Sequence, residues 1–491
     1  MKSDSLILDL SRIDDYFPDD FNDEEIAKGK TLLLKRLSLV LHEFYNGKIQ
    51  VVPKAGLFGY NWFNVWYTPG VSAVSTAIRD DNTLSYDLTS RGNTVAIVSD
   101  STRVLGDGNC TPPGGLGVME GKSLLMKILG GIDAVPLCID SRDRNGEPSP
   151  DKIIDFVKMV QSSFGAINLE DISQPNCYRV LDTLREECEI PVWHDDAQGT
   201  ASVTLAGLIN ALKLAEKEIG EIKTVFLGAG ASNTSIARIA FTAGLDPKKS
   251  VMFDAKGALN GKREDLRGNP AHYRKWEICQ ATNPSNITEL SDAFENADVL
   301  IALSRPGPDY VREEWIRRMN DKPIIFACAN PVPEIYPYAA KRAGAYIVAT
   351  GRGDFPNQIN NSLGFPGILK GALIVGARKI SDDMAIAAAR ALAEFAENRG
   401  IEPDNIIPKM DEMEVFPLEA VAVARQAIKE NSARRNLNDE QILKIARRDI
   451  QQAKETYRLL SENGVIVKPD MKMIHDALDL VVKEVREQRV S

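Results

Sequence analysis

The first 200 residues mix two patterns of apolar and polar positions. Short apolar runs at 94–100, 134–140 and 165–171 predict strands. Between them lie stretches such as 151–164, in which apolar residues recur at helical spacing. This alternation of strand and helix indicates an α/β layer.

From about residue 200 to 380 the alternation becomes regular, and each apolar run is followed by a segment of helical length. Short buried strands joined by helices favour a parallel, doubly wound sheet of the Rossmann type. The runs lie at 224–230, 251–254, 298–304, 323–330 and 345–350.

Long amphipathic helices are predicted near both ends of the chain. Residues 22–46 begin at a capping Asn22 and stop at Gly47, and residues 381–399 begin at Ser381. Helices over 438–464 and 469–488 follow. We therefore expect an N-terminal α/β domain over 1–200, a doubly wound parallel-sheet domain over 201–380, and C-terminal helices over 381–491 that pack on the core or on a second subunit.

Composition and charge narrow the class of protein. The 491 residues include 59 Lys and Arg against 69 Asp and Glu, a net charge of −10 with no basic block, so nucleic acid is not an expected partner. The stretch 365–377 is too short to span a bilayer and is interrupted by Lys370. Six scattered cysteines and an acidic N-terminus without an apolar run indicate a soluble, cytoplasmic protein with reduced thiols.

One glycine-rich loop fits a dinucleotide site. Gly228-Ala229-Gly230 follows a predicted strand and opens a predicted helix, and Asp254 ends the next strand. The two glycines let the backbone approach a pyrophosphate at the helix N-terminus. Asn233 stands where Gly or Ala is usual, so the fingerprint is incomplete.

Two other glycine-rich loops do not fit a nucleotide. Gly106 and Gly108 are followed by Pro112-Pro113, which lack the N–H groups that hold phosphate, so we interpret that loop as a turn. Gly121-Lys122-Ser123 resembles the end of a P-loop, but the pattern requires glycine where Leu116 stands. Lys122 needs another explanation.

Two pairs of acids follow apolar runs. Glu170-Asp171 and Asp195-Asp196 lie where strands of an α/β domain end and open into a crevice. Four converging carboxylates repel one another unless a cation lies among them, and hard divalent ions take oxygen ligands. Mg²⁺ or Mn²⁺ is the expected ion, because no Cys/His pair has zinc spacing. The alternative for either pair alone is that the acids cap loops.

Several polar and aromatic residues are ambiguous from the sequence. Asn330, Asn360 and Asn361 fit ordinary turn chemistry at least as well as a binding role. Arg103 follows a predicted strand and either clamps a carboxylate or faces solvent. The aromatic residues between 58 and 67 fit a core or a subunit interface better than a stacking platform.

Taken together, the motifs resemble those of malic enzymes, the metal-dependent decarboxylating malate dehydrogenases. The resemblance covers roughly residues 60–380 and follows the order of the family's motifs. The matching stretches are Tyr67-Thr68-Pro69-Gly70-Val71, SDSTRVLGDGN around Arg103, MEGKSLL around Lys122, GAINLEDI, HDDAQGTA, LGAGAS, ANPVPEI and ATGRGDFPNQINNSLGFPGILKGAL.

The resemblance implies a role for each matching residue. Lys122 is the expected general base, which must be neutral and therefore needs a lowered pKa; Tyr67 is the expected general acid, and Asp195 supports Lys122. The metal carboxylates would be Glu170, Asp171 and Asp196; the substrate ligands Arg103, Asn330, Asn360 and Asn361; the cofactor residues Gly228, Ala229, Gly230, Ser232, Asp254 and Asn330.

The implied reaction converts L-malate to pyruvate and CO₂ with NAD or NADP, in a homo-oligomer that is at least a dimer. Asp254 favours NAD, because a carboxylate accepts the ribose 2′-OH and repels a 2′-phosphate. Lys256 and Lys262 are close enough in sequence to offset that repulsion, so NADP stays open. Two alternatives remain: a malolactic-type or oxaloacetate-decarboxylating relative with tightly bound NAD, and a nucleotide-binding module without activity.

Overall fold

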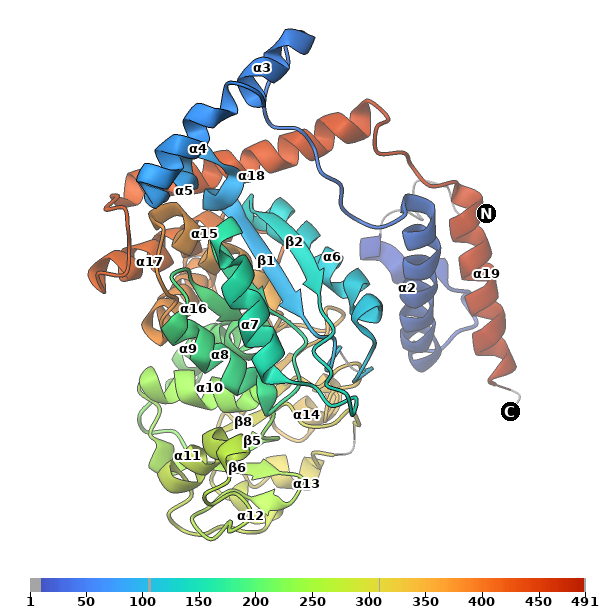
Figure 1. The fold of residues 1–491 in the computed structure, drawn as a ribbon. Coiled ribbons are helices and arrows are strands. Elements are labelled where there is room, and N and C mark those ends of the chain that lie inside the picture. Colours follow the sequence, from blue (N-terminus) through green and yellow to red (C-terminus); the bar gives the residue numbers. More distant parts are fainter. Residues whose placement is uncertain (1–9, 105–106, 309, 490–491) are drawn as a thin grey trace. The chain divides into compact units, whose positions relative to one another are not determined.

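The computed structural model of the chain describes residues 10–104, 107–308 and 310–489 (Figure 1). The chain forms two compact units, one made of Met1–Val52 with Lys454–Ser491 and the other of Pro53–Ala453. Gly106, in the loop interpreted above as a turn, lies outside the described residues. No helix among the described residues is long and apolar enough to cross a membrane.

The smaller unit is built on two helices, α2 (Asp23–Tyr45) and α19 (Met471–Glu487). As predicted, Asn22 caps α2: its side chain accepts from the Glu25 N–H, while Glu25 accepts from the Asn22 N–H. Leu33 of α2 and Val481 of α19 lie in the apolar core of this unit. Each helix buries one stripe of side chains, as its amphipathic sequence predicts.

In the larger unit, the first sheet has the strand order β2-β1-β3-β4, and all its strands are parallel. The predicted strands are confirmed, and helices occupy the segments between them. The elements are β1 Thr94–Ser99, α6 Pro112–Gly130, β2 Asp133–Cys138, α7 Pro150–Val160, β3 Ala166–Leu169, α8 Asn176–Glu187 and β4 Val192–His194.

The second sheet has the order β10-β9-β8-β5-β6-β7, parallel except for the short β7. All five predicted strands from this part of the chain are confirmed, as is the doubly wound, parallel α/β class. The strands are β5 Thr224–Leu227, β6 Ser250–Asp254, β7 Gly257–Ala258, β8 Val299–Ala302, β9 Ile324–Ala327 and β10 Ile347–Thr350; the helices are α10 Ala231–Thr242, α11 Tyr273–Ala281, α12 Leu290–Ala293, α13 Glu313–Ile316 and α14 Pro337–Arg342.

One apolar core joins the two sheets. It contains Ile97 of the first sheet, Phe226 of the second, and side chains from the surrounding helices, α6 and α10 among them. Helical periodicity does not predict one of these helices, α17, because it is apolar on most of its circumference. Four further helices that contribute to this core are α9 Thr200–Ala215, α15 Phe365–Val375, α16 Asp382–Arg399 and α17 Val415–Lys429.

Three short helices begin the larger unit, and α18 (Asp439–Glu462) runs from the larger unit into the smaller one, which resumes at Lys454. The three short helices are α3 (Phe63–Trp66), α4 (Val71–Asp80) and α5 (Ser85–Leu88), and α18 follows α17. The C-terminal part is helical, as expected. The domain boundaries at residues 200 and 380 stay predictions.

Candidate active site

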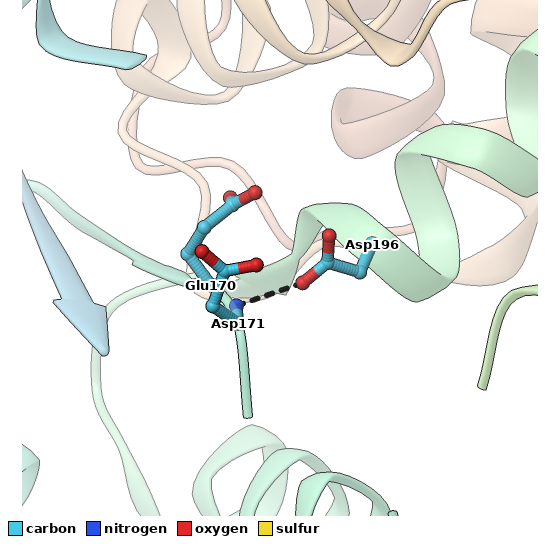
Figure 2. Close-up of side chains that lie close together, drawn as sticks. All are labelled: Glu170, Asp171 and Asp196. Carbon is cyan, nitrogen blue, oxygen red and sulfur yellow. Dashed lines mark hydrogen bonds between the residues drawn. The ribbon is translucent and has the colours of Figure 1, made fainter. Parts of the chain in front are cut away.

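Three carboxylates gather where two strands of the first sheet end. Glu170 and Asp171 follow β3, and Asp196 lies in η6 (Asp195–Gly199), the short π-type turn after β4. Their ligand atoms lie within 4.8 Å of one another, and the Asp171 N–H donates to Oδ2 of Asp196 at 2.8 Å (Figure 2). The predicted convergence of these acids is therefore present in the fold, because parallel strands end at one edge of their sheet.

This cluster fits a divalent cation. Glu170 is 2% exposed, and burial together with the neighbouring acids raises the pKa of its carboxyl well above the usual range, although Lys122 acts in the opposite direction. Three carboxylates held this close are costly without positive charge among them. Oxygen ligands of this kind suit Mg²⁺ or Mn²⁺.

Lys122 reaches the same cluster from α6. Its Nζ donates to Oδ2 of Asp195, lies 3.1 Å from Oε1 of Glu170, and lies 4.5 Å from the centre of the Phe365 ring. Burial alone would lower the pKa of Lys122, but Asp195 and Glu170 outweigh burial and raise that pKa. The lowered pKa that a general base needs is therefore not found, because the neighbouring carboxylates stabilise the ammonium form of Lys122.

Two buried side chains that sequence reasoning missed orient the acids. Asn168 donates to Oε2 of Glu170 at 2.9 Å, and the Trp193 indole N–H donates to Oδ1 of Asp195 at 3.3 Å. Each lies two residues before its acid, and in a strand residues two apart share a face. A polar residue within an apolar strand, such as Asn168, is the signal that would have found one of them.

The glycine loop lies at the carboxyl end of β5. Gly228 has φ +98°, and a side chain there would collide with the Leu303 carbonyl, so glycine is required. In the described part of the chain, no atom lies within 4 Å of the position that a Cβ would take at Gly230, which leaves the N-terminus of α10 open. Ala229, between them, is buried.

The side chain of Asn233, which stands where the dinucleotide-binding motif usually has Gly or Ala, has a structural role in this fold. Its buried Nδ2 lies 2.8 Å from the Gly228 carbonyl, 3.2 Å from that of Leu227 and 3.3 Å from that of Ile301. The amide therefore links the end of β5 to β8. Ser232, predicted to bind cofactor, donates to the Asp196 carbonyl at 2.8 Å and connects the glycine loop to the acidic cluster.

Two of the four predicted substrate residues contact the segments that carry the acids, and the other two contact other parts of the chain. The Arg103 N–H donates to the Asp171 carbonyl at 3.0 Å and its side chain is exposed, while Asn361 lies against Gly199 in η6. Asn330 follows β9 (Ile324–Ala327) with its amide against Gly351. Asn360 accepts from the Ser362 N–H and caps η9 (Asn361–Leu363), which is the turn role left open above.

Tyr67 is not brought to the cluster. Its side chain is 72% exposed, whereas Lys122 is 9% exposed. Among the described residues, no hydrogen bond or ring contact joins the Tyr67 side chain to the acids or to Lys122. A proton donor to a buried carbanion needs shelter from water, so Tyr67 lacks the surroundings that its expected role requires.

A buried acid lies behind the cluster. Glu419 of α17 is fully buried, and neither of its carboxylate oxygens has a hydrogen-bond partner among the residues that the structure describes. It lies so close to Gly367 of α15 that any side chain at Gly367 would collide with it. Burial, and more weakly the charge of Asp195, raises the pKa of Glu419 well above its ordinary value of 4.5.

We expect Glu419→Gln to flatten the pH dependence of stability. The folded chain holds a proton on Glu419 that the unfolded chain releases near pH 4.5, so wild-type stability falls as pH rises through the folded pKa. Each unit of raised pKa corresponds to about 1.4 kcal/mol. Between pH 5 and 9, the melting temperature of Glu419→Gln should fall less with rising pH than that of the wild type. The same dependence of melting temperature on pH in the wild type, in Glu419→Gln and in the exposed control Glu414→Gln would contradict this.

Comparison with known proteins covers both sheets. The family model "Malic enzyme, N-terminal domain" matches residues 46–185, and "Malic enzyme, NAD binding domain" matches residues 197–428. The bifunctional malic/malolactic enzyme of Bacillus subtilis is 40% identical over 416 residues, which are 84% of this chain and 98% of that protein. The NAD-dependent malic enzyme of Geobacillus stearothermophilus is 42% identical over 389 residues, 79% of this chain and 77% of that protein.

A solved structure extends the likeness to nearly the whole chain. The crystal structure of the Entamoeba histolytica malic enzyme is 61% identical, with a TM-score of 0.94, and the match covers 97% of this chain and 98% of that one. Relatives named NADP-dependent malic enzymes also match. The paired acids, the buried lysine beside them and the glycine loop thus occur in a chain that belongs to the malic enzyme family.

Proposed function

We propose that this chain catalyses the oxidative decarboxylation of L-malate to pyruvate and CO₂, with reduction of NAD or NADP and dependence on a divalent metal. The observation that carries the proposal is the contact between Lys122, Asp195 and Glu170 beside a three-carboxylate cluster. It supplies a proton acceptor and a cation site at one place, connected to the glycine loop through Ser232. A cytoplasmic location remains a prediction.

Different side chains carry out the proton transfers and the binding of the substrate. Lys122, held by Asp195, takes the proton of the C2 hydroxyl, and Tyr67 later delivers a proton to C3 once the C3–C4 bond has broken. Arg103 and Asn361, with Asn330, bind the substrate carboxylates. Glu170, Asp171 and Asp196 would hold the cation, which would supply Lewis acidity to the C2 oxygen, and a nicotinamide bound at the glycine loop would supply the hydride acceptor.

The proposal is tested by product analysis. Purified protein is incubated with L-malate, Mn²⁺ and either NAD or NADP, and reduced cofactor, pyruvate and lactate are quantified with and without EDTA. One pyruvate for each reduced cofactor, abolished by EDTA, is the expected result. Lactate without reduced cofactor would indicate the malolactic alternative, an activity that the name of the Bacillus subtilis relative includes. No consumption of malate would contradict both the oxidative and the malolactic reaction.

We further infer a homo-oligomer, at least a dimer. Every residue from 53 to 70 is exposed, and contiguous apolar surface of this kind is typical of an interface. A second copy of the chain is the occupant we infer, because that copy would shelter Tyr67, which the chain by itself leaves in solvent. The exposed apolar residues of this segment are Leu57, Phe58, Tyr60, Trp62, Phe63, Val65, Trp66 and Tyr67.

Complementation between two inactive variants tests this arrangement. Co-expressed Tyr67→Phe and Lys122→Ala chains are expected to regain about a quarter of wild-type turnover, since about half of randomly formed dimers are hybrids and one of two sites in each hybrid is intact. Turnover of the co-expressed mixture is the measurement, and hybrids purified through two different tags should reach about half of wild-type turnover. Co-expression of Tyr67→Phe with the double variant should restore nothing. Inactive hybrids of verified composition would show that Tyr67 serves its own subunit.

A further inference from the structure

Asp254 lies where the adenosine end of a dinucleotide is expected. It ends β6, next to β5, whose carboxyl end carries the glycine loop. A free carboxylate at this place accepts the ribose 2′-OH and excludes a 2′-phosphate. The selection of NAD over NADP by Asp254 therefore depends on whether its oxygens are free.

Three hydrogen bonds and one ion pair hold this carboxylate. Arg263 binds it with both arms of its guanidinium, at 2.9 Å to Oδ1 and 3.0 Å to Oδ2. The Lys256 N–H donates to Oδ1 at 2.9 Å, and Nζ of Lys275 lies 3.5 Å from Oδ2. Two oxygens offer about four lone-pair positions; three of them accept these hydrogen bonds, and the Lys275 ammonium lies beside Oδ2, so a ribose hydroxyl would compete with that cation.

Positive charge exceeds negative charge around Asp254. Arg263 also binds Asp265, with its Nε 2.8 Å from Oδ1, and the Lys256 ammonium lies 3.2 Å from Oδ2 of Asp265. Three cations thus face two carboxylates in this cluster. The Lys256 side chain is 72% exposed and remains able to turn towards a ligand. An additional anion would be attracted here rather than repelled.

We propose that this cluster is a subsite for the 2′-phosphate of NADP, with Lys275 and Lys256 as its ligands and Asp254 held by Arg263 as their support. The chain then binds NADP at least as tightly as NAD. This inference rests on the proposed function, because it assumes that the chain binds a dinucleotide. It reverses the preference for NAD over NADP that Asp254 alone suggests.

Binding of cofactor fragments by calorimetry tests the subsite without turnover. Adenosine 2′,5′-bisphosphate is expected to bind at least about tenfold more tightly than 5′-AMP, the effect of one charge-assisted hydrogen bond. Lys275→Gln should remove that advantage and leave 5′-AMP binding within about twofold. Lys256→Gln, an exposed change with no effect on folding, should reduce the advantage in the same direction. Lys248→Gln, before the amino end of β6, is the matched control.

The outcomes separate this inference from the proposed function. A bisphosphate that binds no more tightly than 5′-AMP, while NAD still binds, would overturn the subsite and leave the function standing. An advantage that survives both Lys275→Gln and Lys256→Gln would also overturn it. Failure of NAD, NADP and both fragments to bind would instead contradict the proposed function.

Discussion

Replacing Lys122 by alanine is expected to lower turnover about 100- to 10,000-fold, the usual contribution of a placed acid–base group. The same change leaves Asp195 and Glu170 buried without the ammonium that contacts both of them. Breaking a buried ion pair by removing one partner costs about 3–5 kcal/mol of folding stability. Lys122→Ala should therefore lose turnover and also melt at a lower temperature.

Lys122→Arg separates these two effects. A guanidinium keeps the positive charge beside the carboxylates but stays protonated at every accessible pH, so it cannot accept a proton. The arginine variant should recover much of the melting temperature and none of the turnover. Measurable proton-transfer activity in Lys122→Arg, or near wild-type rates in Lys122→Ala, would remove Lys122 from the role of base.

Asp171→Asn is expected to abolish metal-dependent turnover, with a loss of about a hundredfold or more, because Lewis-acid stabilisation is worth several kcal/mol. Asp171 has φ +53°, a left-handed conformation that asparagine tolerates well. The variant therefore keeps the backbone of the site and removes one negative charge from the cluster. Activity titrated with Mn²⁺ measures the effect.

A binding measurement distinguishes loss of metal from loss of chemistry. Mn²⁺ at about 100 times its dissociation constant should stabilise the wild type by about 2.7 kcal/mol, seen as a higher melting temperature. Asp171→Asn should show little of this stabilisation. Asp140→Asn, an exposed acid after β2, should behave as the wild type does. Equal stabilisation of Asp171→Asn and wild type would mean that the carboxylate cluster is not the metal site.

The layers of the fold and the place of the acids at the strand ends could be predicted from the amino-acid sequence. The strands before Glu170 and Asp195 can be recognised in the sequence because strands buried on both faces appear as continuous apolar runs. The carboxyl ends of parallel strands lie at the same edge of the sheet, which places the acids together. Capping at Asn22 and Ser381 is equally local, since each side chain bonds within three residues. The short helix α3 and the mostly buried α17 carry little periodic signal.

The pairing of the charged side chains could not be predicted in this way, because it depends on how distant segments pack. The contact of Lys122 with Asp195 joins residues 73 positions apart, and no local pattern specifies such a pairing. The same holds for Arg263 and Lys275 around Asp254, where the sequence suggested a free carboxylate. Glu419 follows the same rule, since its burial depends on a glycine of another helix. The spacing of apolar residues along the sequence indicates whether a side chain is buried. Which residue it contacts depends on how distant segments of the chain pack.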